Sequence, residues 1–207
     1  MLPLELSIAP GNWNIFNGRK YDKAFHSLRD KVFARDYYTC QYCGFQAREH
    51  QEVVNIDGDY RNNPIDNLAT ACVFCSQCLF LESVGVAFGG GKLIFLPEIT
   101  QAELNSFCHV IFCAMTNKTA YINSAQVCYR NLRLYAQPVE KKFGNNTSSP
   151  ANFSRLLLNQ REFNSSIQKE LFKEIRLLPS YTKFKAELSD WAAAAVAELS
   201  KEGEANG

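Results

Sequence analysis

Short apolar and polar patterns mark the elements of the first hundred residues. Apolar side chains alternate with polar ones over residues 4–8, which predicts a strand that ends before Pro10. Apolar residues at helical spacing over residues 24–34 predict a helix. Short runs over residues 52–56 and 92–96 predict two further strands. This part of the chain is therefore expected to mix small strands with a helix.

Helical periodicity dominates the second half of the chain. Thr100 followed by Glu103 is a capping-box pattern, in which side chains and backbone amides bond reciprocally at the start of a helix. A stretch rich in Gly, Asn and Ser over residues 141–152 predicts an exposed loop. Helices are expected over residues 100–115 and 119–135, from Pro150 onward, over residues 167–178, and from a cap at Ser180 to about residue 200.

Two Cys-x-x-Cys pairs carry the clearest chemical signal. Cys40 and Cys43 form the first pair, and Cys72 and Cys75 form the second after 28 intervening residues. Four thiolates in two such knuckles suit one tetrahedral, structural Zn²⁺ ion with no open coordination position. Cys78 extends the series, either as a buried thiol of the core or as an exchanged ligand. We expect a zinc site held by the four paired cysteines.

The pattern changes near Pro97 and divides the chain. We predict an α+β protein in which residues 1–96 form a small zinc-binding module of two zinc knuckles, short strands and a helix. A helix over residues 72–81 is expected to carry the second cysteine pair. Residues 97–200 are expected to form a mainly α-helical region, and residues 201–207 a disordered tail.

Composition narrows the classes of function. The chain has 207 residues, 46% of them hydrophobic, and its 22 basic and 21 acidic residues give a net charge of +1. Nucleic-acid binders gain affinity largely by neutralising phosphates, so a nucleic-acid partner is unexpected. The eight cysteines follow no secretory signal, and no apolar stretch is long enough to span a bilayer. We therefore expect a cytoplasmic protein with reduced cysteines and no direct membrane insertion.

The residues around the two cysteine pairs resemble the HNH endonuclease family in its zinc-knuckle form. The resemblance is carried by Tyr38 to Gly44, Glu52-Val53 and Asp66 to Cys75, all within residues 35–80. It implies a strand–loop–helix unit with a His base and a metal ligand on the strand, an Asn in the loop and another His on the helix. In this sequence those positions fall on Val54, Asn55, Asn67 and Ser76.

Only Asn67 keeps a residue type that the HNH chemistry uses. A valine side chain cannot bind Mg²⁺, and a neutral carboxamide is no general base near neutral pH. Asp57 and Asp59 either shape a turn or replace a lost ligand. His50 either lies on a solvated edge or serves as a relocated base. We expect the turn and the solvated edge, with no catalytic residue and no enzymatic activity.

A second resemblance spans most of the chain. Its matching segments are Arg35-Asp36, Cys43 to Arg48, Val54 to Tyr60, Leu81 to Val86, Leu96 to Asn105, Lys142 to Gly144 and Ile175 to Ser180. They resemble a subunit family of the Dot/Icm type IV secretion system of intracellular bacterial pathogens. The resemblance implies a non-enzymatic cytoplasmic subunit of the coupling-protein complex, recruited to the inner membrane, that helps to recruit effectors.

The same resemblance implies the partners. It indicates the C-terminal extension of the coupling ATPase DotL as the bound segment, beside the IcmS–IcmW adaptor pair, and no small-molecule substrate. Trp191 and some of the Phe and Tyr residues are candidate partner contacts. Two alternatives stay open: an HNH-type endonuclease with displaced catalytic groups, and a zinc-dependent nucleic-acid-binding module. Metal-dependent plasmid cleavage would favour the former, and salt-dependent DNA binding would favour the latter.

Overall fold

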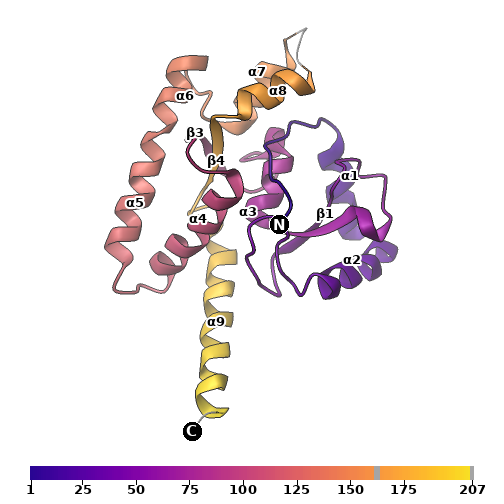
Figure 1. Ribbon diagram of the computed structural model, residues 1–207, viewed down its shortest axis with the longest axis vertical. Coiled ribbons are helices and arrows are strands. Elements are labelled where there is room, and N and C mark those ends of the chain that lie inside the picture. Colours follow the sequence, from indigo (N-terminus) through magenta and orange to yellow (C-terminus); the bar gives the residue numbers. More distant parts are fainter. Residues whose placement is uncertain (161–163, 206–207) are drawn as a thin grey trace.

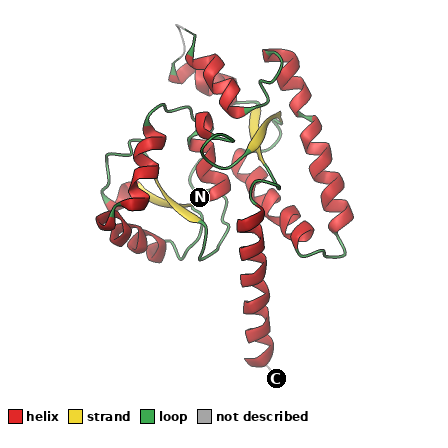
Figure 2. Ribbon diagram, turned by 180° about the vertical axis from the view of Figure 1, so that it is seen from behind, coloured by secondary structure: helices red, strands yellow, loops and turns green. Residues whose placement is uncertain are grey.

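Two small antiparallel sheets, each packed against helices, organise the chain (Figure 1). The computed structural model describes residues 1–160 and 164–205. The first half contains α1 (Asn12–Gly18), α2 (Lys23–Arg35), β1 (Gln51–Asn55), β2 (Leu68–Cys72) and α3 (Val73–Ser76). The second half contains β3 (Gly91–Phe95), α4 (Gln101–Thr116), α5 (Ile122–Leu134), α6 (Ala136–Phe143), α7 (Pro150–Leu158), α8 (Ser165–Phe172), β4 (Ile175–Pro179) and α9 (Lys185–Ala205). The two sheets lie apart from each other (Figure 2).

The first sheet is a hairpin of β1 and β2. Gln51 pairs with Cys72 at one end, and Asn55 pairs with Leu68 at the other. Apolar residues of α2 pack on this hairpin and form a small core with it, made of Phe25, Val32, Phe33, Val53 and Leu68. Because α3 follows β2 directly, the hairpin also fixes where the second cysteine pair lies.

The second sheet joins residues that are far apart in the sequence. β3 and β4 run antiparallel, with Gly91 opposite Pro179 and Phe95 opposite Ile175. The strands approach closely at Gly91, where an added Cβ would lie 2.5 Å from the carbonyl oxygen of Leu178. β3 precedes the boundary expected near residue 97, yet its hydrogen-bonding partner belongs to the helical region.

A hydrophobic core runs through both halves of the chain. Members of this one cluster include Leu6, Phe74, Leu104, Phe153 and Leu178. The last helix, α9, starts at this core and projects away from the rest of the molecule (Figure 1). Among the described residues, no helix is both long enough and apolar enough to cross a membrane.

The mixed content of helices and short strands predicted for the first half is confirmed. Residues 4–8 are extended and alternately buried, but they do not form a ladder strand. The segment's backbone bonds to other parts of the protein at two residues: the Ser7 amide donates to the Cys78 carbonyl and the Ser7 carbonyl accepts from the Leu81 amide, while the Ile8 amide donates to Gln168 Oε1. The helix predicted over residues 72–81 reduces to the short α3 and 3₁₀ turns. β2 was not predicted, because its five buried residues show no alternation.

The helix predicted over residues 167–178 is wrong in its second part. α8 ends at Phe172, and the apolar residues from Ile175 onward form β4 instead. A short apolar run fits a helix stripe and a buried strand equally well, and here pairing with β3 decides the outcome.

Three further boundaries differ from the prediction. The loop expected over residues 141–152 begins inside α6, and the last helix begins at Lys185 rather than after a cap at Ser180. α9 continues to Ala205, so residues 201–205 of the expected tail are helical. Residues 206–207 of that tail lie outside the described residues.

Candidate metal centre

The first cysteine pair lies in a tight turn between α2 and β1. Gly44 has a φ of 78°, a left-handed conformation that suits glycine, and its amide donates to the Cys40 carbonyl at 3.0 Å. The Cys40 amide in turn donates to the Phe45 carbonyl at 2.9 Å. The Gln41 amide donates to the Thr70 carbonyl of β2 at 2.8 Å. The turn is therefore held beside the strand that ends in the second pair.

All four paired cysteines meet in the core. Their sulfur atoms lie within 4.8 Å of one another, and the sulfurs of Cys43 and Cys72 are 3.6 Å apart. Zinc–sulfur bonds of about 2.3 Å in a tetrahedron place the ligand sulfurs about 3.8 Å apart. All four cysteines are buried, and none forms a disulfide. This cysteine quartet therefore has the donors and the spacing of a closed site for one metal ion.

The quartet combines one cysteine of lowered pKa with two of raised pKa. Thiols of Cys43, Cys72 and Cys75 hydrogen-bond to Cys40, and these bonds hold the Cys40 pKa far below its ordinary value. Burial raises the pKa of Cys72 and of Cys75 well above the ordinary value. A bound divalent ion stabilises thiolates and permits further deprotonation.

Two polar residues of α4 lie against the sulfurs. Asn105 is fully buried, and its Nδ2 donates to the Cys75 sulfur at 3.2 Å. The Nε2 of His109, one turn later, lies 3.3 Å from the Cys72 sulfur. Burial lowers the pKa of His109 to about 3, so the neutral ring can donate from this nitrogen. The sequence indicates a structural role for His109 in its helix but did not connect His109 or Asn105 with the cysteines, although their four-residue spacing on a predicted helix was an available signal.

Aromatic rings surround His109 and connect the metal centre to the last helix. The rings of Phe45 and Phe74 stack on the imidazole, with centroids 3.7 Å and 4.3 Å away. Trp191 of α9 lies 5.3 Å from His109 and 4.8 Å from Phe45. Its Nε1 donates to the Glu49 carbonyl at 3.0 Å. Trp191, a candidate partner contact in the sequence, therefore packs within the chain.

Cys78 lies outside the quartet. Its sulfur donates to the Phe74 carbonyl at 3.2 Å, and burial raises its pKa. The sulfur of Cys78 is not among the four that lie within 4.8 Å of one another. These surroundings are those of a protonated thiol in the core, which was one of the two interpretations of this residue.

Buried structural residues occupy the positions where the HNH resemblance places catalytic groups. Val54 and Ser76 have no exposed surface, and Ser76 bonds to the Val73 carbonyl. Asn55 is also buried, and its Nδ2 donates to the Asp59 carbonyl at 2.8 Å. None of these side chains presents a metal ligand or a base to solvent.

A buried guanidinium occupies the polar end of the hairpin. Arg19 follows α1, and its Nη1 donates to Asn55 Oδ1 at 2.8 Å. Its Nη2 donates to the Tyr60 carbonyl and to Asn63 Oδ1. The Phe25 ring lies 4.5 Å from its Cζ. A fixed positive charge at a mapped metal position opposes a divalent cation there. Arg19 follows a glycine in a polar stretch, so no sequence pattern predicted its burial.

Asp57 and Asp59 shape the loop after β1, as expected. Asp57 Oδ1 accepts from the Asp59 amide at 2.9 Å, and Asp59 Oδ1 accepts from the Arg61 amide at 3.0 Å. Asn67 Oδ1 accepts from the Asp57 amide at 3.1 Å. Hydrogen bonding with Asn67, and to a smaller extent with Asn62, holds the pKa of Asp57 below its ordinary value. The carboxylates therefore serve the turn.

His50 is too far from the mapped catalytic positions to replace the lost base. It precedes β1, and Val54 lies four residues along the strand, which corresponds to about 13 Å. The Nε2 of His50 instead lies 2.7 Å from Asp190 Oδ2 on α9, where both side chains are partly exposed. His50 therefore lies at a partly exposed edge, as expected from the sequence, and this position fits a surface residue better than a catalytic base.

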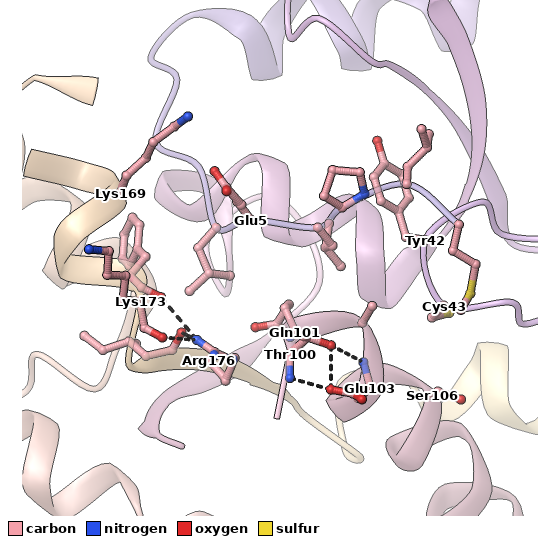
Figure 3. Close-up of a pocket in the computed structure, with 18 residues that line it drawn as sticks. Glu5, Tyr42, Cys43, Thr100, Gln101, Glu103, Ser106, Lys169, Lys173 and Arg176 are labelled. Carbon is pink, nitrogen blue, oxygen red and sulfur yellow. Dashed lines mark hydrogen bonds between the residues drawn. The ribbon is translucent and has the colours of Figure 1, made fainter. Parts of the chain in front are cut away.

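A cavity of about 690 Å³ lies beside the first cysteine pair (Figure 3). Tyr42 and Cys43 line one end, and Lys169, Lys173 and Arg176 line the other. The guanidinium of Arg176 donates to backbone carbonyls, and the Thr100–Glu103 capping box closes the wall formed by α4. The bonds of Arg176 and of the capping box hold the walls of this mainly apolar cavity, which has basic side chains at one end.

Comparison with known proteins gives the family. No family model matches this chain, so the HNH likeness rests on its motifs alone. A curated relative, the type 4 apparatus protein DotN of Legionella pneumophila subsp. pneumophila (strain Philadelphia 1), is 54% identical over 197 residues. The match covers 95% of this chain and 92% of the relative. The resemblance to a Dot/Icm subunit is thereby confirmed, and the chain belongs to the family of the type 4 apparatus protein DotN.

Proposed function

We propose that this chain is a non-catalytic, zinc-stabilised subunit of a type IV secretion coupling-protein complex. The observation that carries the proposal is the 54% identity with the type 4 apparatus protein DotN over almost the whole of both chains. In this role the chain binds the C-terminal extension of the coupling ATPase DotL and helps to recruit effectors beside the IcmS–IcmW pair. It works at the cytoplasmic side of the inner membrane and acts on no small molecule.

Zinc is the ion that we propose for the cysteine quartet. Four thiolate ligands at tetrahedral spacing suit Zn²⁺, and soft sulfur donors disfavour Mg²⁺ and Ca²⁺. N–H donors from Asn105 and His109 support the metal-bound sulfurs. With four protein ligands, the ion has no position for substrate or water. Its role is therefore to stabilise the fold.

The surroundings of the hairpin support a role without catalysis. Val54, Asn55 and Ser76 are buried at the positions where the HNH resemblance puts a base and metal ligands. The guanidinium of Arg19 bonds to Asn55 and places a positive charge where a catalytic cation would lie. These observations disfavour the endonuclease alternative.

The outer face of α5 is where we propose that the ATPase segment docks. Ala125 is the buried residue of this helix, whereas Val127 and Leu134 are exposed, as are Tyr121 and Tyr135 at its two ends. This α5 surface lies at the edge of the molecule (Figure 1). Exposed apolar side chains seven residues apart, such as Val127 and Leu134, provide anchors for an amphipathic or extended peptide.

Calorimetry with the purified C-terminal extension of DotL tests the proposal. We expect a Kd between micromolar and tens of nanomolar, about 8–10 kcal/mol, with weak salt dependence because the net charge is only +1. Leu134→Asp should weaken binding at least about tenfold, while Val86→Asp, at a more exposed apolar position outside α5, should not. Normal binding by Leu134→Asp would reject the α5 surface. No heat and no co-elution at about 50 µM would reject the subunit role itself.

A further inference from the structure

A second group of metal-ligating side chains lies outside the cysteine quartet. Glu49 and His50 precede β1, and Asp190 lies in the second turn of α9. One donor atom of each lies within 4.8 Å of the other two, although 140 residues separate His50 from Asp190. Among the side chains that the structure describes, this group and the quartet are the sets of three or more such residues found at this spacing.

Contacts that do not involve the donor atoms hold this group together. Trp191 Nε1 donates to the backbone carbonyl of Glu49 at 3.0 Å. The Trp191 ring packs 4.8 Å from Phe45 and 6.0 Å from His50. The loop before β1 and the start of α9 are thus fixed relative to each other before any ion binds. Donors on such a fixed framework lose little conformational freedom when they coordinate a metal.

The charge of the group favours a cation. Its donors are the two carboxylates of Glu49 and Asp190 and the one imidazole of His50. His50 pairs with Asp190 at 2.7 Å, whereas the Glu49 carboxylate forms no ion pair within the described part of the chain. A divalent ion would neutralise both carboxylates and leave the imidazole neutral.

The donor types select the kind of metal. An imidazole with two carboxylates suits Zn²⁺ and similar first-row ions, and water completes the coordination. Bonds of about 2.0–2.2 Å place tetrahedral donors about 3.4 Å apart, so the His50–Asp190 pair has to open slightly. The Asp190 side chain is 53% exposed and can rotate to allow this. The same exposure makes a bound ion exchangeable, unlike one in the buried quartet.

We propose that Glu49, His50 and Asp190 form a second, exchangeable Zn²⁺ site that clamps α9 to the loop before β1. The site belongs to the folded chain itself and does not depend on the proposed role in secretion. When occupied, it links two segments that otherwise meet through Trp191 and the single His50–Asp190 pair. Binding of the ion therefore stabilises the docked position of α9.

A metal count on the full-length protein tests this site. The protein is first dialysed against EDTA, which removes exchangeable metal while the quartet keeps its ion, and then equilibrated with about 100 µM Zn²⁺. We expect one additional equivalent of zinc. His50→Gln and Asp190→Asn should each return the count to the quartet value. Glu198→Gln removes another carboxylate of α9, which lines a surface pocket together with Glu49 and Asp190, and this variant should keep the second equivalent.

A thermal readout separates this site from a purely structural ion pair. Added Zn²⁺ should raise the melting temperature of the wild type and of Glu198→Gln, but not of His50→Gln. The melting temperatures in EDTA show that each variant is folded. Absence of a second equivalent in the wild type would overturn the proposal. Retention of it by His50→Gln or Asp190→Asn would do the same.

Discussion

Asn105 and His109 place N–H groups 3.2 Å and 3.3 Å from two of the four quartet sulfurs. A Zn²⁺ ion with four thiolates carries a formal charge of −2, and burying such a charge is costly unless hydrogen bonds spread it. Both residues lie on one buried face of α4, whose capping box at Thr100 fixes where the helix begins. The helical region thus supplies hydrogen-bond donors to the proposed metal centre, whose four cysteines all come from the first half.

Loss of one quartet sulfur tests the metal centre directly. Cys72→Ser should lose the metal and unfold the first half of the chain, because structural zinc can contribute on the order of 10 kcal/mol. Metal analysis and thermal melting report the two effects. Cys113→Ser, an exposed cysteine outside the quartet, is the matched control and should change neither. Stoichiometric metal and normal melting in Cys72→Ser would indicate that Cys78 takes its place.

The hydrogen bond from Asn105 makes a separate prediction. Asn105→Asp keeps the side-chain shape but removes the N–H donor and adds negative charge beside the thiolates. Metal should then be lost to a chelator about 10–100-fold more readily. Asn117→Asp is the control, since Asn117 donates to Cys113 in the same way at the exposed end of α4. Equal metal retention by the two variants would argue against support from Asn105.

Glu82 makes a prediction about pH. Burial raises the pKa of Glu82, and its Oε1 is buried without a hydrogen-bond partner. Ionisation at pH 7 therefore costs the folded state stability, and this cost disappears as the pH falls toward the ordinary carboxyl value of about 4.3. Glu82→Gln should raise the melting temperature at pH 7, and the gain should shrink as the pH is lowered.

Glu103→Gln should change the melting temperature at pH 7 in the opposite direction to Glu82→Gln. Bonds from the Thr100 backbone and side chain lower the pKa of Glu103, so its charge stabilises the folded state near neutral pH. This variant should melt earlier than the wild type at pH 7, and the difference should shrink on acidification. If both variants shifted in the same direction at pH 7, the assignment for Glu82 would be wrong.

At the level of elements, sequence patterns predicted the helices whose bounds depend on nearby residues. The capping box sets the start of α4 at Gln101, and helical spacing places α2 at Lys23–Arg35. The four quartet cysteines were proposed from spacing alone, and the structure brings their sulfurs together. Elements that depend on distant partners were missed. The apolar run from Ile175 becomes β4 only because β3 pairs with it, and no local pattern encodes that pairing.

The β3–β4 pairing predicts the effect of a single methyl group. Gly91→Ala places a Cβ 2.5 Å from the Leu178 carbonyl oxygen and 2.9 Å from Leu177 Cδ1, so the strands must move apart. We expect a loss of about 1–3 kcal/mol in unfolding free energy, measured in urea. Gly18→Ala has no atom within 4 Å of the new Cβ and should change stability by no more than about 0.5 kcal/mol. Equal effects of the two substitutions would contradict the close approach at Gly91.

At the level of the whole molecule, a catalytic role and a structural role require different side chains on the β1–β2 hairpin. An endonuclease needs exposed ligands at its metal, whereas Val54, Asn55 and Ser76 are buried. Purified protein should therefore cleave plasmid DNA no faster than buffer with Mg²⁺, Mn²⁺ or Ni²⁺. His50→Ala is the decisive variant for this assay. Cleavage that copurifies with the protein and disappears in His50→Ala would contradict the proposed non-catalytic role.

During synthesis, β3 leaves the ribosome well before β4, the strand with which it pairs. β3 ends at Phe95 and β4 begins only at Ile175, so a ribosome adding about 5–20 residues per second needs about 4–16 s to make the intervening chain. For those seconds the nascent chain carries an unpaired strand edge, which invites pairing with neighbouring chains. Slow translation between residues 95 and 175 would lengthen this exposure and lower the yield of folded protein, even though the finished sequence is unchanged.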